Sequence, residues 1–133
     1  MDKFKDKVII ITGASEGIGR ALSLSLSSQK PKLVLAARNK ERLVQLKEEA
    51  EPKGSKCLAV PTDVSKKTEC KILIDRTISE FGCLDVLVNN AGRTMWTTLQ
   101  EMEDPAIIEQ RIRINYLGAA HCTYYVPSGR GTF

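Results

Sequence analysis

The segment from Gly13 to Gly19, Gly-Ala-Ser-Glu-Gly-Ile-Gly, has the residue types and spacing of a phosphate-binding turn. Three glycines suit this task because a tight turn needs backbone freedom, and because a phosphate approaches the main chain closely only where no Cβ intervenes. A helix that begins at such a turn presents unbonded N–H groups to the anion. A tight loop without a ligand is the alternative interpretation. We favour a dinucleotide site, and its expected contacts are Gly13, Ser15, Glu16, Gly17, Ile18 and Gly19.

The elements around this turn follow a regular alternation. Short apolar runs, rich in β-branched residues, alternate with amphipathic patterns, which indicates a parallel sheet covered by helices. The run 8–11 is continuously apolar, as in a strand that is buried on both faces. The predicted strands are 8–11, 33–36, 57–60 and 84–88, and the predicted helices follow them near 18–26, 40–50, 70–81 and 105–126. The glycine turn therefore lies between the first strand and the first helix, where a phosphate site is expected.

Size and charge limit the classes of protein that fit. The 133 residues, of which 42% are hydrophobic, correspond to one globular domain spanning 1–133. The net charge of +4 comes from 20 basic and 16 acidic residues. These charges form no long run, so we expect a solvated surface and no nucleic-acid partner.

The cysteines and the N-terminal segment give further expectations. Cys57, Cys70, Cys83 and Cys122 lie too far apart for a CxxC pair, and His121 is the only histidine, so we expect no metal site and reduced thiols. The first residues contain no apolar run of the ~20 residues that a membrane span needs. Their apolar stretch is also interrupted too soon for a signal peptide. We expect a cytoplasmic protein without a membrane partner.

Three further motifs occur in a characteristic order after the glycine turn. Asp63-Val64 follows the third strand, Asn89-Asn90-Ala91-Gly92 follows the fourth, and Asn115 lies in the last helix. With the glycine turn, these motifs make the chain resemble the short-chain dehydrogenase/reductase family from Lys7 to Tyr125. The resemblance implies an α/β, Rossmann-type parallel sheet with strand order 3-2-1-4. It also implies that the cofactor contacts Asp63, Val64, Asn90, Ala91 and Gly92, and that Asn115 is a catalytic residue.

The choice of cofactor depends on the residues that follow the second strand. An acid about 20 residues beyond the glycine turn would bind the ribose 2′-hydroxyl of NAD, whereas an arginine would accept the 2′-phosphate of NADP. The sequence there reads Ala36-Ala37-Arg38-Asn39-Lys40, with no acid before Glu41. Arg38 can form a bidentate, charge-assisted pair with a phosphate. We therefore predict NADP(H) rather than NAD(H), although the Glu16 carboxylate near the phosphates counts against it.

The family's catalytic residues beyond Asn115 are not found. The resemblance implies a serine after the next strand and a Tyr-x-x-x-Lys pair, in which the lysine cation lowers the pKa of the tyrosine. No lysine follows Lys71 in this sequence, and Ser128 comes too early for the catalytic serine. We therefore interpret the chain as an incomplete domain, truncated after the fourth strand and the following helix.

Two functions remain compatible with these residues. The first is an NADP-dependent oxidoreductase that interconverts a small-molecule carbonyl and an alcohol, represented by a chain that is itself inactive. The second is a non-catalytic module derived from that family, which binds a dinucleotide or another chain. The resemblance also implies a homo-oligomer, because the family's helix equivalent to 105–126 packs against a partner subunit. The sequence does not identify the substrate.

Overall fold

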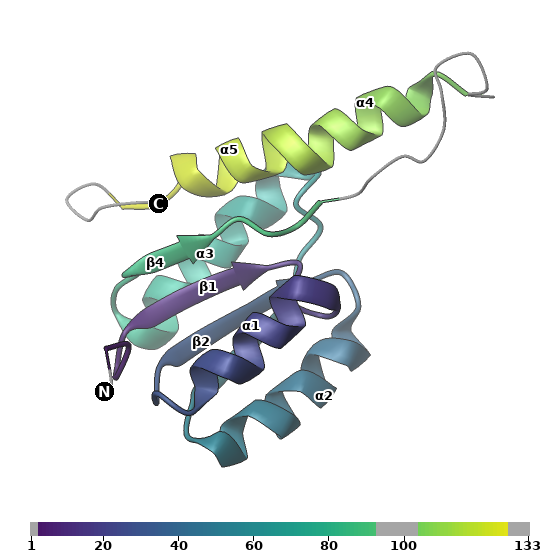
Figure 1. The fold of residues 1–133 in the computed structure, drawn as a ribbon. Helices are drawn as coiled ribbons and strands as arrows, with labels where there is room; N and C mark the ends of the chain where they lie inside the picture. The colour runs from purple at the N-terminus through teal and green to yellow at the C-terminus, as the bar shows by residue number, and fades with distance from the viewer. Residues whose placement is uncertain (1–2, 93–103, 128–133) are drawn as a thin grey trace.

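Four parallel strands form the centre of the computed structural model, which describes residues 3–92 and 104–127 (Figure 1). Their order in the sheet is β3-β2-β1-β4, so the predicted Rossmann-type order is confirmed. Every pairing among these strands is parallel. The strands are β1 (Val8–Thr12), β2 (Lys32–Ala37), β3 (Lys56–Pro61) and β4 (Val86–Val88).

The central strand β1 is buried on both faces, as its sequence predicts. Its side chains alternate between two apolar clusters: Ile9 and Ile11 belong to one, and Val8 and Ile10 belong to the other. Within the sheet, Ile10 pairs with residues of both neighbouring strands, β2 and β4. A continuous β-branched run is suited to this position because both faces of a parallel sheet must be covered.

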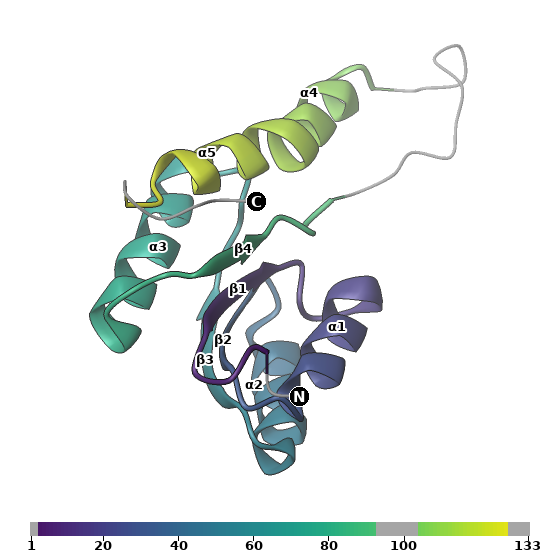
Figure 2. The ribbon, with the colours of Figure 1, turned by 60° about the vertical axis from the view of Figure 1, so that its left-hand side comes forward.

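Helices cover the sheet on its two faces (Figure 2). Helices α1 (Gly17–Ser27) and α2 (Lys40–Ala50) pack on the face that carries Ile9 and Ile11. Helix α3 (Lys67–Phe81) and a second, long helix pack on the opposite face. A short 3-10 turn over Glu51–Lys53 connects α2 to β3.

Local signals explain where the helices begin and end. The side chain of Asn39 caps α2 by accepting a hydrogen bond from the Arg42 N–H at 3.1 Å. Helix α3 ends at Gly82, whose φ of 79° is readily adopted only by glycine. Helices α1 and α3 lack such an N-terminal cap, because their N-cap residues Glu16 and Lys66 make no capping side-chain hydrogen bond. The first N–H groups of α1 are therefore not satisfied by a side chain.

Two elements differ from the sequence prediction. Strand β4 begins at Val86 rather than Leu84. Just before it, the Asp85 N–H donates to the Val8 carbonyl at 2.9 Å, while the Val8 N–H donates to the Asp85 carboxylate at 2.9 Å instead of to a backbone carbonyl. The long helix predicted over 105–126 spans α4 (Ala106–Ile112), a π-helical turn (Arg113–Leu117) and α5 (Gly118–Tyr124). Hydrophobic periodicity does not indicate such a turn, although π turns are frequent at functional sites.

No helix in the residues that the structure describes is both long and apolar enough to cross a lipid bilayer. The long helix in particular carries polar residues along its exposed side, beside the exposed Ile112 and Tyr116.

Replacement of Leu46 by alanine tests how α2 is attached to the sheet. Leu46 is fully buried against β2 and β3, so the variant loses apolar contacts and leaves a cavity. We expect the free energy of unfolding, measured by urea denaturation followed by circular dichroism, to fall by about 2–4 kcal/mol. The matched control is Val44→Ala on the exposed side of the same helix, with a change within about 0.5 kcal/mol. Equal losses for the two variants would contradict this packing.

Candidate dinucleotide-binding site

A cleft of about 550 Å³ lies at the carboxyl ends of the four strands. The loops that follow β1, β2, β3 and β4 line it, together with Ile114 of the long helix. In an open α/β sheet this edge is where ligands bind. Every residue predicted to contact the cofactor lines the cleft except Gly19; those in the lining are Gly13, Ser15, Glu16, Gly17, Ile18, Arg38, Asp63, Val64, Asn90, Ala91 and Gly92.

Two of the three glycines allow the turn to pack closely against neighbouring segments. Gly13 has a φ of 65°, and a Cβ added there would lie 2.9 Å from the Cα of Ala91. A Cβ added at Gly19 would overlap the Gly13 carbonyl oxygen and come within 2.6 Å of the Asn90 side-chain nitrogen. Gly17 has a φ of 59° and open space around it. Gly19 therefore lies beneath the turn and allows close packing, whereas Gly17 faces the cleft.

The hydroxyl of Thr12 ties the glycine turn to the loop after β4. Its Oγ1 accepts hydrogen bonds from the N–H groups of Asn90 and Ala91, both at 3.0 Å, and donates to the Val88 carbonyl at 3.3 Å. The Asn90 side chain completes the contact by donating to the Gly13 carbonyl at 3.3 Å. Sequence reasoning did not select Thr12. Its position at the end of a buried strand, directly before the first glycine, is the signal that could have identified it.

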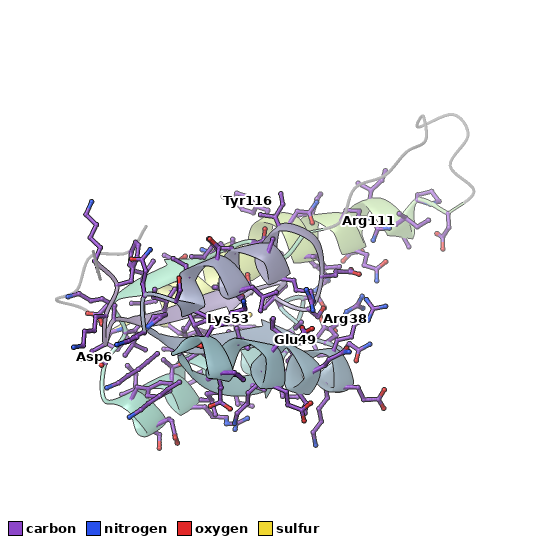
Figure 3. All side chains as sticks on the ribbon, turned by 60° about the horizontal axis from the view of Figure 1, so that its bottom comes forward. Asp6, Arg38, Glu49, Lys53, Arg111 and Tyr116 are labelled. Atoms are coloured by element: carbon purple, nitrogen blue, oxygen red, sulfur yellow. The ribbon has the colours of Figure 1, made fainter. Side chains whose placement is uncertain are left out.

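Charged residues gather where β2 meets α2. Arg38 is exposed on the cleft, at the end of the sheet opposite Asp6 (Figure 3). Arg42 also lines the cleft, and its guanidinium contacts the Glu16 carboxylate at 2.8 Å. Sequence reasoning did not select Arg42, which lies one helical turn beyond Arg38. Among the described residues no ion pair involves Arg38.

Asp63 is held in an ionised state beside the cleft. Its Oδ1 accepts hydrogen bonds from the Ser65 hydroxyl at 2.6 Å and the Ser65 N–H at 3.0 Å. Desolvation alone would raise the pKa of Asp63, but these bonds and the charges of Arg38 and Lys66 together hold the pKa below its ordinary value. The neighbouring Val64 packs against Gly118, where an added Cβ would lie 2.9 Å from its side chain.

The π turn brings Asn115 next to the loop after β4. The side-chain oxygen of Asn115 would lie 3.3 Å from a Cβ added at Gly92. Asn115 itself is exposed, while the adjacent Ile114 is buried and lines the cleft. The predicted catalytic asparagine is therefore close to the predicted cofactor residues, although it is not part of the cleft wall. Ser128 lies outside the described residues.

This arrangement suits a nicotinamide dinucleotide better than a metal ion. Gly17 leaves open space beside the cleft that a Cβ would fill, the α1 N-terminus lacks a side-chain cap, and an arginine lines the cleft. Residues 3–92 and 104–127 contain no group of three His, Cys, Asp or Glu side chains that could hold a metal ion.

The family model for the short chain dehydrogenase matches residues 7–128. The chain belongs to the short-chain dehydrogenase family. The resemblance inferred from the glycine turn and the Asn-Asn-Ala-Gly motif is confirmed by this match.

Curated relatives of this chain include plant proteins. The 11-beta-hydroxysteroid dehydrogenase A of Sesamum indicum is 40% identical over 130 residues, which cover 94% of this chain and 37% of the relative. The 11-beta-hydroxysteroid dehydrogenase of Pinus massoniana is 38% identical over 125 residues, covering 93% of this chain and 35% of the relative. The chain thus spans well under half the length of these relatives.

Solved structures of the family share the fold. An NAD⁺-bound xylitol dehydrogenase has a TM-score of 0.87 and 29% identity, covering 93% of this chain and 48% of its own. An alcohol dehydrogenase from the archaeon Thermococcus sibiricus, complexed with 5-hydroxy-NADP, has a TM-score of 0.85 and 32% identity, covering 90% and 51%. Both NAD-type and NADP-type nucleotides are therefore bound by structural neighbours of this chain.

Replacement of Gly19 by alanine should destabilise the protein, whereas the same change elsewhere in a helix usually stabilises it. In an ordinary helix, alanine in place of glycine stabilises by up to about 1 kcal/mol. Here the new Cβ meets the Gly13 carbonyl and the Asn90 side chain, so we expect the unfolding free energy to fall by about 1–3 kcal/mol in urea denaturation. Ser25→Ala, on the exposed side of α1, is the control and should be neutral or slightly stabilising. A stabilised Gly19→Ala variant would show that the close approach does not exist.

The lowered pKa of Asp63 predicts that Ser65→Ala changes the stability of the fold in a pH-dependent way. Because the folded-state pKa is lowered, ionisation of Asp63 stabilises the fold above the ordinary carboxyl range, and this contribution is lost as the pH falls through the folded pKa. Removing the Ser65 hydroxyl should raise the Asp63 pKa, measured by carboxyl NMR titration. The stability difference from wild type should be present at neutral pH and shrink as the pH falls through the lowered folded-state pKa of Asp63. An unchanged Asp63 pKa in the variant would refute this assignment.

Proposed function

We propose that this protein is the cofactor-binding part of an NADP(H)-dependent oxidoreductase that interconverts a small-molecule carbonyl and an alcohol. The observation that carries the proposal is the cleft itself, in which the glycine turn, the uncapped α1 N-terminus and Arg38 line one continuous surface. Membership of the short-chain dehydrogenase family supports the reaction class.

The residues of the cleft have separate roles in this proposal. The N–H groups at the start of α1 bind the pyrophosphate, because Gly17 has no Cβ and leaves the main chain accessible. Arg38 binds the 2′-phosphate, which favours NADP over NAD. Asp63 and Val64 line the adenine end, while Asn90, Ala91 and Gly92 line the part of the cleft beside β1 and β4. When bound, the nicotinamide would supply or accept the hydride.

The catalytic half of the reaction depends on residues that this sequence does not contain. Asn115 is the catalytic residue that we assign, and it lies beside Gly92. No lysine follows Lys71, so no Tyr-x-x-x-Lys pair exists in these 133 residues. We therefore propose that the 133-residue chain binds the dinucleotide without turning it over.

A second candidate is a module of the same family that binds a dinucleotide or another chain without catalysis of its own. In both cases we propose a cytoplasmic homo-oligomer that associates through the long helix, where Ile112 and Tyr116 are exposed. An exposed apolar stripe of this kind suits a contact with a second copy.

Binding of NADP⁺ and NAD⁺, measured by isothermal titration calorimetry, tests the proposed function. We expect the purified chain to bind both and to prefer NADP⁺. Arg38→Gln should weaken NADP⁺ binding about tenfold or more, because a charge-assisted hydrogen bond is lost, and should change NAD⁺ binding less than about twofold. The matched control is Arg76→Gln on the exposed side of α3, which should change neither affinity.

Two results would contradict this proposal. A folded wild-type chain that binds neither dinucleotide would exclude the assigned cleft. Sustained turnover of NADPH with a panel of carbonyl compounds would show that the chain has a complete catalytic site.

A further inference from the structure

Two of the residues that line the cleft form an ion pair with each other. Glu16, in the glycine turn before α1, and Arg42, in the first turn of α2, meet at 2.8 Å, and both line the cleft. The two residues are 26 positions apart in the sequence. The pair therefore joins the proposed pyrophosphate-binding turn to the β2–α2 corner, where Arg38 faces the cleft.

The Glu16–Arg42 pair contributes little to the stability of the fold. Its side chains are 55% and 77% exposed, and ion pairs so exposed contribute little because water and salt screen them. Arg20 and Glu49 already form another ion pair between the same two helices, away from the cleft. The Glu16–Arg42 pair is more exposed than that one, and it lines the cleft.

The charges that line the cleft balance one another. Two arginines, Arg38 and Arg42, face two carboxylates, Glu16 and Asp63, so their formal charges sum to zero. Arg42 is held against Glu16, whereas no ion pair involves Arg38 among the described residues. An added phosphate would therefore meet one arginine that is available and a second that is already paired.

We propose that Arg42 is a second 2′-phosphate ligand and that Glu16 limits its availability, so that the Glu16–Arg42 pair sets how strongly NADP is preferred over NAD. This inference rests on the proposed dinucleotide binding. On binding NADP, the Arg42 guanidinium exchanges the Glu16 carboxylate for the 2′-phosphate. NAD lacks that phosphate and leaves the pair intact. Asn39 supports the exchange, because its side chain fixes the Arg42 backbone at the start of α2.

The readout is the ratio of the NAD⁺ to the NADP⁺ dissociation constant, since any effect of Glu16 on the shared pyrophosphate cancels in it. Calorimetric titrations of wild type, Glu16→Gln, Arg42→Gln and the double variant give this ratio. We expect Glu16→Gln to raise it about two- to fivefold, because Arg42 then binds the 2′-phosphate without first breaking an exposed ion pair. Arg42→Gln should lower it about threefold or more, and Glu16→Gln should have no effect on the ratio in the Arg42→Gln background.

The matched control is Glu49→Gln, which makes the same charge change in the other ion pair between α1 and α2. It should leave the ratio unchanged. All of these side chains are exposed, and circular dichroism verifies that each variant is folded.

Three outcomes separate this inference from the proposed function. Failure of folded wild type to bind either dinucleotide would overturn both. Binding with a ratio that Glu16→Gln and Arg42→Gln leave unchanged would overturn the role of Arg42 alone. An equal gain for NAD⁺ and NADP⁺ in Glu16→Gln would show that Glu16 acts only by repelling the pyrophosphate, and would likewise overturn the role of Arg42.

Discussion

The close approach of the glycine turn to the loop after β4 is the contact on which the site depends. The Thr12 hydroxyl accepts hydrogen bonds from two backbone N–H groups of that loop. Gly13 and Gly19 have no side chains that would keep the two segments apart. Buried backbone groups need such partners, because an unpaired N–H costs free energy. With this contact made, the start of α1 and the end of β4 share one wall of the cleft.

Much of this architecture could be predicted because it follows from local chemistry. The β-branched run of β1 needs two covered faces, Asn39 is a good cap at the start of α2, and Gly82 ends α3 with a positive φ. Parallel strands place the residues after them at one edge, so motifs distant in sequence were expected to meet. The family match and the strand order confirm those expectations of fold. The roles of the individual site residues stay predictions.

Features that arise from contacts between distant segments could not be predicted from the sequence. At the start of β4 the Val8 N–H donates a hydrogen bond to the Asp85 carboxylate, a contact that no local pattern encodes. The π turn around Asn115 leaves the apolar spacing of the helix nearly unchanged. Arg42 looked like one more solvated charge of α2, and only the fold brings it to Glu16. Charge pairs of this kind can be identified only in the tertiary structure, because side chains at any separation in the sequence can meet in the fold.

The separation of the contacting segments also matters while the chain is being made. Thr12 and Ala91, which hydrogen-bond in the finished structure, are 79 residues apart. At a synthesis rate of about 5–20 residues per second, roughly 4–16 seconds pass between the appearance of the two. During that interval the glycine turn and β1 exist without β4, so the first strand has a neighbour on one side only. The nascent chain therefore exposes an apolar strand edge, of the kind that chaperones protect, before it has a place for a nucleotide.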